Sequence, residues 1–117
     1  MADTIDLKPE DFLMREGEAS DSMYYVKSGT LAIYKRKGGA EKQIGTIYAG
    51  ELVGEMSFLD SQPRSASVKA IQESEVVEIP RVKFNKFLEG QPSWFRALLE
   101  TLLDRLRRAN TRIKIDI

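Results

Sequence analysis

Four residues in the middle of the chain have the types and spacing to hold a phosphate joined to a sugar. Gly54 lets the backbone approach a ligand closely, and Glu55 opens a five-residue run, as long as one helical turn, whose free amides can bind an anion. Arg64, directly after Pro63, offers the planar fork of donors that matches a phosphate, and Ser65 adds a hydroxyl and an amide. A carboxylate beside a phosphate site is unfavourable unless it accepts from a sugar hydroxyl. The set therefore fits a phosphate attached to a ribose.

The same residues also permit two plainer structures. Glu55 and Arg64 can form a surface ion pair, which contributes little stability. Gly54 can mark a bulge in a strand.

The amino-acid composition argues against catalytic and metal-binding functions. The 117 residues suffice for one domain, and 18 basic and 18 acidic side chains give a net charge of zero, which argues against direct nucleic-acid binding. Without His or Cys, the chain lacks the usual general base, thiolate chemistry and the metal ligands of cupin-like enzymes. We expect no catalytic residues, no metal and no enzyme activity. The acidic N-terminus is no signal peptide and no apolar stretch can span a bilayer, so we expect a cytoplasmic protein without membrane attachment.

Short apolar runs separated by turn residues occupy about residues 7–80. They predict an α+β, mainly β fold: an antiparallel β jelly roll or sandwich, followed by a short helix and a long C-terminal amphipathic helix. Gly38-Gly39, between two such runs, is typical of a tight hairpin. The expected strands are 12–14, 23–27, 31–35, 43–48, 65–70 and 76–79.

Two helices are expected after the β region. Residues 81–90 form the short one, because aromatic and leucine residues recur at helical spacing before Gly90. Residues 92–114 form the long one, which begins at Pro92. Its apolar residues follow at intervals of 4, 3, 4, 3 and 4, a heptad seam that favours a parallel homodimer over a monomer whose helix folds back on its own sheet. We expect one domain, 1–117, with this dimerisation seam: Phe95, Leu99, Leu102, Leu106, Ala109 and Ile113.

The stretch Gly54-Glu55-x8-Arg64-Ser65-Ala66 resembles the phosphate-binding cassette of the cyclic nucleotide-binding domain family, found in bacterial catabolite activators and in regulatory subunits of cyclic AMP-dependent protein kinase. Upstream, Glu16-Gly17-Glu18 and the run from Met23 to Tyr34 resemble the family's strand–turn–strand pattern. Glu78-Ile79 and the two helices resemble its closing segment. The resemblance covers about residues 7–113, and the cassette, residues 50–68, has the kinase-type spacing.

The resemblance implies a cyclic nucleotide ligand and no other cofactor. Glu55 would accept the ribose 2′-hydroxyl, with the Gly54 backbone on the ribose side, and Arg64 would pair with the exocyclic phosphate oxygens. Ser57 and Ser65 would supply backbone amides. In the family, base contacts come largely from the long helix, partly from a partner subunit. The expected ligand-binding set is Gly54, Glu55, Met56, Ser57, Arg64, Ser65, Asn110 and Thr111.

The identity of the base depends on Asn110 and Thr111. An asparagine can bond the amino group and ring nitrogen of adenine together, which favours cyclic AMP, although a solvated position on the helix suits Asn110 equally well. A hydroxyl residue after the arginine occurs in binders of both cyclic AMP and cyclic GMP, so cyclic GMP is the alternative. A second alternative is a degenerate domain that only dimerises, which the intact Glu55, Arg64 and Ser65 disfavour.

The chain ends with the long helix, without the DNA-reading segment of the catabolite activators or a kinase or channel segment. We expect a regulatory sensor that transmits ligand occupancy through this helix to an effector domain or partner protein outside the chain.

Overall fold

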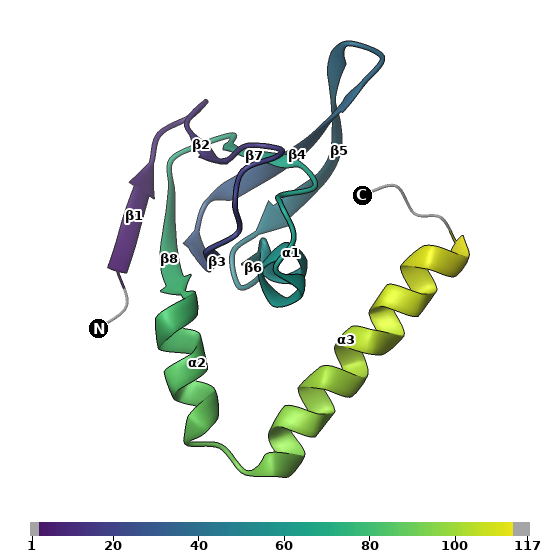
Figure 1. Ribbon diagram of the computed structural model, residues 1–117. Helices are drawn as coiled ribbons and strands as arrows, with labels where there is room; N and C mark the ends of the chain where they lie inside the picture. Colours follow the sequence, from purple (N-terminus) through teal and green to yellow (C-terminus); the bar gives the residue numbers. More distant parts are fainter. Residues whose placement is uncertain (1–2, 114–117) are drawn as a thin grey trace. The chain divides into compact units, whose positions relative to one another are not determined.

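Eight strands form two antiparallel sheets in the computed structural model, which describes the backbone of residues 3–113 and the side chains of residues 3–109 (Figure 1). One sheet has the strand order β1-β8-β3-β6 and the other has the order β2-β7-β4-β5. The expected mainly β, antiparallel fold is confirmed. The strands are β1 (Asp3–Leu7), β2 (Phe12–Met14), β3 (Ser22–Ser28), β4 (Thr30–Lys37), β5 (Ala40–Tyr48), β6 (Leu52–Val53), β7 (Ser67–Ala70) and β8 (Ser74–Pro80).

The chain divides into two units, Met1–Arg81 and Val82–Ile117. The first unit holds both sheets and a short helix, α1 (Glu55–Asp60). The second holds α3 (Ser93–Ile113) and all but the first residue of α2 (Arg81–Glu89).

The core of the first unit draws inward-facing side chains from both sheets. Val26 and Val76 come from one sheet and Leu31 from the other, and none of the three retains exposed surface. Fully burying side chains of this size stabilises the fold by about 1.5–3 kcal/mol each. Phe58 of α1 is also completely buried. The core therefore fixes α1, which carries part of the expected cassette, against the β framework.

The hairpin expected at Gly38-Gly39 is confirmed. Lys37 pairs with Ala40 across β4 and β5, and the two glycines between them have φ angles of 58° and 82°. Positive φ at both central positions defines a type I′ turn, whose twist suits a two-residue hairpin.

The structure adds two strands to those expected. Residues 3–7 were expected to lie before the β region, but β1 pairs with β8 from Asp3↔Glu78 to Leu7↔Ser74. Its sequence, Asp-Thr-Ile-Asp-Leu, has no regular alternation of polar and apolar residues that would indicate a strand, so the pairing with a distant segment decides the structure. The two-residue β6 pairs with Tyr24 and Tyr25 in the same way. Strand β7 begins at Ser67, two residues later than expected, which leaves Ser65 and Ala66 outside the ladder.

The two expected helices are present with nearly the expected bounds. In α3 the seam residues Leu102 and Leu106 are about half exposed, at 48% and 50%, and Ala109 is exposed. Phe95 and Leu99, nearer the start of the helix, are half-buried. Ile113 lies beyond the residues whose side chains are described.

Candidate functional site

Gly54 stands at the point where β6 turns into α1. It occupies the N-cap position with φ 77° and ψ 13°, a left-handed conformation that disfavours other residues. A Cβ atom built at Gly54 would lie 2.6 Å from Nη1 of Arg64 and 2.8 Å from Cε of Met14. The backbone angle therefore favours glycine here, and any other residue would also have to displace the ends of the Arg64 and Met14 side chains. Gly54 is no bulge inside a strand.

Arg64 is buried beside Gly54. Only 5% of its surface is exposed, Nη1 donates to the Gly54 carbonyl at 2.8 Å, and Nη2 donates to the Ser22 carbonyl. Burial lowers the pKa of the guanidinium from its ordinary value. No ion pair joins Arg64 to Glu55 among the described residues, which argues against the surface pair considered from the sequence. The guanidinium is a buried cation held by neutral carbonyls.

The turn at residues 16–18 holds the backbone of Arg64 from both sides. The Gly17 N–H donates to the Arg64 carbonyl at 2.9 Å, and the Arg64 N–H donates to the Glu18 carbonyl at 2.8 Å. The next two amides have no such partner: among the described residues, neither the Ser65 N–H nor the Ala66 N–H donates a hydrogen bond. Two successive donors are therefore available directly after a buried arginine, which suits an anion.

The remaining cassette residues form the first turn of α1. Glu55, Met56 and Ser57 are half-buried, and no side chain caps the start of this helix. The structure thus brings together Gly54, Arg64 and the α1 turn, with Ser65 next in sequence. Asn110 and Thr111 belong to the second unit, and their side chains lie outside the described residues.

Ser20 is a residue that the sequence analysis missed. Its hydroxyl contacts the Ser57 carbonyl at 2.9 Å and the Gln62 carbonyl at 2.5 Å, and only 5% of the residue is exposed. Ser20 therefore ties the loop before β3 to the first turn of α1 and to the loop that follows this helix. A single serine in a polar loop gives no signal of such a position.

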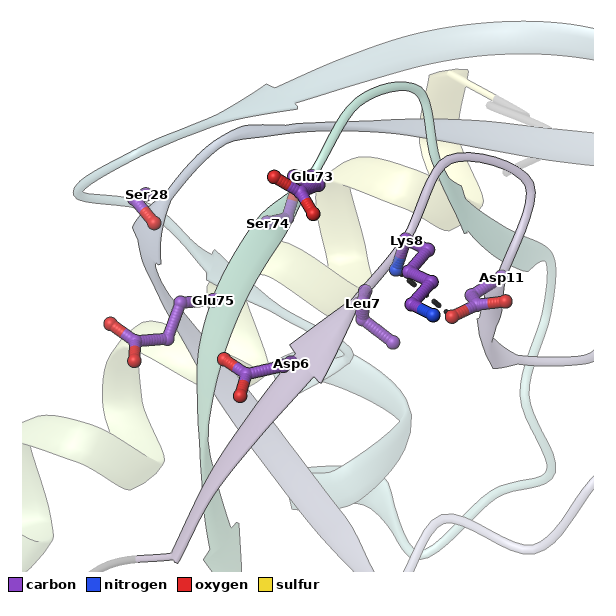
Figure 2. A pocket seen from close by; sticks show the side chains of 8 residues that line it. All are labelled: Asp6, Leu7, Lys8, Asp11, Ser28, Glu73, Ser74 and Glu75. Carbon is purple, nitrogen blue, oxygen red and sulfur yellow. Dashed lines mark hydrogen bonds between the residues drawn. The ribbon is translucent and has the colours of Figure 1, made fainter.

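A hollow of about 600 Å³ lies apart from the cassette, between the ends of β1 and β3 and the start of β8 (Figure 2). Four carboxylates and one lysine line it, so its charge disfavours a phosphate. Within residues 3–109, no group of three or more acidic side chains has a geometry that could hold a metal ion. The lining residues are Asp6, Leu7, Lys8, Asp11, Ser28, Glu73, Ser74 and Glu75.

The structure is a β domain of two antiparallel sheets in which a buried arginine lies beside the start of a short helix. The family model described as cyclic nucleotide-binding domain matches residues 4–91, and the chain belongs to this family. As a member of this family, it is a cyclic nucleotide-binding regulatory domain. No helix within the described residues is long and apolar enough to cross a membrane.

Two curated relatives and one solved structure illustrate the similarity. The CRP-like cAMP-activated global transcriptional regulator of Mycobacterium tuberculosis is 31% identical, over 94% of this chain and 52% of the relative. The cAMP-dependent protein kinase regulatory subunit of Emericella nidulans is 31% identical, over 74% of this chain and 20% of the relative. The cAMP-bound EAL enzyme Bd1971 aligns with a TM-score of 0.75 and 29% identity, covering 97% of this chain and 30% of that one.

A cGMP-bound structure of the same enzyme aligns with a TM-score of 0.76 and 28% identity, covering 94% of this chain and 30% of that one. The chain spans about half the length of the mycobacterial regulator.

Proposed function

We propose that residues 50–68 bind cyclic AMP, in preference to cyclic GMP, and that occupancy of this site is transmitted through the C-terminal helices without catalysis. The observation that carries the proposal is the buried Arg64, whose charge is held by two carbonyls beside the unpaired amides of Ser65 and Ala66. Asp21 and Glu18 interact with Arg64 only through space, and no carboxylate forms an ion pair with it among the described residues. A buried cation without such a pair attracts an anion strongly. The cyclic phosphate is the anion that fits the family.

The sugar contacts follow from the order of residues around Gly54. Glu55 begins α1 directly after the Gly54 turn, and no cation pairs with its carboxylate among the described residues. We assign Glu55 to the ribose 2′-hydroxyl, the Gly54 backbone to the ribose side, and the amides of Met56 and Ser57 to the same face of the ligand. All of these assigned contacts require the ribose to lie at the start of α1.

The base preference depends on residues of the second unit. We assign Asn110 and Thr111 to base contacts, which would favour adenine through the two adjacent hydrogen bonds that an asparagine amide can make. The names of the mycobacterial regulator and the fungal kinase subunit both specify cAMP. Because Bd1971 has structures with cAMP and with cGMP, a cyclic GMP sensor is the second candidate.

Transmission is supported by Arg81, the first residue of α2. Its Nη2 donates to the Phe58 carbonyl at 2.8 Å and to the Ser20 carbonyl at 2.7 Å, and its guanidinium carbon lies 4.4 Å from the centre of the Phe58 ring. The Arg81 N–H also donates to the Asp21 carbonyl at 3.0 Å. Since Phe58 belongs to α1, a shift of α1 on ligand binding would pull directly on the start of α2.

The long helix α3 completes the proposal. We propose that its seam, half exposed at Leu102 and Leu106, pairs with a second copy of the chain and brings Asn110 and Thr111 towards the ligand of the partner. The signal would then reach an effector domain or a partner protein. We place the protein in the cytoplasm, with which its lack of cysteine is compatible.

Calorimetric titration with cyclic AMP, cyclic GMP and 5′-AMP tests the proposal. We expect the tightest binding for cyclic AMP, weaker binding for cyclic GMP, and none for 5′-AMP, whose phosphate carries an extra charge and no ring. Tighter binding of cyclic GMP would favour the second candidate. Absence of binding to any cyclic nucleotide would show a degenerate domain that serves only dimerisation.

A further inference from the structure

Lys35 contacts the cassette from a different strand. The ladder between β4 and β7 ends at the pair Tyr34↔Ser67, and Lys35 is the next residue of β4. Its ammonium Nζ donates to the Ser65 carbonyl at 2.9 Å. A side chain thus continues the link between the two strands where the backbone pairing stops.

The charge around Lys35 makes this contact unusual. Lys35 faces Lys42 directly across β4 and β5, and like charges in such a position repel. No carboxylate lies within ion-pair distance of the Lys35 ammonium among the described residues. The cation therefore contacts the segment after Arg64 through a neutral carbonyl and not through an ion pair.

The bond to Ser65 also orients the peptide that follows. In a trans peptide the C=O and the N–H point in opposite directions, and the chain has no cis peptide among its described residues. Lys35 holds the Ser65 carbonyl, so the Ala66 N–H points away from Lys35. Gly17 holds the Arg64 carbonyl and so orients the Ser65 N–H in the same manner. These two N–H groups are the ones that lack a partner.

We propose that Lys35 is a positioning residue of the phosphate site. It fixes the Ser65–Ala66 peptide so that the Ala66 N–H is held ready for the cyclic phosphate, and its charge adds to that of Arg64 in attracting the anion. This proposal rests on the proposed function of the cassette.

The test compares Lys35→Met and Lys35→Arg with a matched control, Lys37→Met, in calorimetric titrations with cyclic AMP. Lys37 lies two residues further along β4, at the exposed end of the hairpin, and its removal changes the net charge equally. We expect Lys35→Met to weaken binding by about tenfold, as for the loss of one charge-assisted contact. Lys35→Arg should stay within about threefold of wild type, because the cation and its donors are retained, and Lys37→Met should bind like wild type.

Thermal melting without ligand separates positioning from a purely structural contact. We expect Lys35→Met and Lys37→Met to have the same melting temperature, because an exposed hydrogen bond from a lysine contributes little to stability. The proposal is overturned if Lys35→Met binds as tightly as Lys37→Met, if Lys35→Arg fails to restore affinity, or if the loss of affinity is matched by a loss of stability. A wild-type protein that binds no cyclic nucleotide would instead refute the proposed function, and this inference with it.

Discussion

Replacing Arg64 by alanine is expected to weaken the fold as well as ligand binding. The side chain is 5% exposed and bonds the carbonyls of Gly54 and Ser22. A hydrogen bond from a charged group contributes about 1.5–3 kcal/mol, and its loss leaves a carbonyl without its partner. Because the contact with Gly54 is only partly buried, water can replace part of that bond. We expect Arg64→Ala to lower the free energy of unfolding by about 3–5 kcal/mol.

Urea denaturation with and without cyclic AMP measures this effect. A loss of this size is a large part of the roughly 5–15 kcal/mol typical of a domain, and it lowers the melting temperature by roughly 10–20 °C. Arg36→Ala is the control, because Arg36 is exposed and its guanidinium makes no hydrogen bond or ion pair among the described residues. Arg64→Lys should recover part of the stability, since one ammonium cannot supply the planar fork that reaches both carbonyls.

Binding is measured at a temperature at which Arg64→Ala is still folded. Losing a bidentate contact to the phosphate should weaken cyclic AMP binding at least about 100-fold. Unfolding of Arg64→Ala at the same urea concentration as Arg36→Ala would refute the structural role of the buried guanidinium. Binding within a few-fold of wild type would refute its assignment to the phosphate.

Three further predictions concern the sugar, the transmission and the assembly. Wild type should bind cyclic AMP about tenfold more tightly than its 2′-deoxy analogue, and Glu55→Ala should abolish this preference because the hydrogen-bond acceptor is lost. Unchanged selectivity of Glu55→Ala in competition titrations would show that Glu55 does not contact the ribose. Arg81→Met should bind cyclic AMP within about threefold of wild type but lose the ligand-induced change in fluorescence of Trp94, the only tryptophan, which is 66% exposed in α3. An identical fluorescence response in the variant would show that coupling does not run through Arg81. Wild type should sediment as a dimer at tens of micromolar. Leu106→Glu should sediment as a monomer, because burying an unpaired carboxylate in the seam is unfavourable. A wild type that is monomeric with and without ligand would contradict the pairing of α3.

The sequence predicts the strands whose apolar residues alternate within a local run, and it predicts the hairpin from two glycines. It misses β1 because Asp3–Leu7 becomes a strand only through pairing with β8, some seventy residues away. The same limit applies to β6, whose two residues pair with Tyr24 and Tyr25. Local patterns carry no information about partners that are distant in the chain.

The site shows a related limit. Residue types identify Gly54, Glu55 and Arg64 as a set, but they do not indicate that Arg64 is buried. In the structure Arg64 is buried and donates to the carbonyls of Ser22 and Gly54. Every residue has a backbone carbonyl, so a sequence does not indicate which carbonyls a side chain will contact. The sequence assigns no role to Ser20 or Lys35 for the same reason, since their partners are carbonyls of Ser57, Gln62 and Ser65.

The order of strands in the two sheets has a consequence for how the chain folds. Asp3 pairs with Glu78, so the edge strand β1 cannot join its sheet until nearly the whole first unit has been synthesised. Pairings of such long sequence separation slow folding to the millisecond-to-second range typical of β-rich domains. Until then, β8 presents an open edge to which other chains can add. In pulse-labelled hydrogen exchange, the amides of β1 should become protected last, together with their partners on β8.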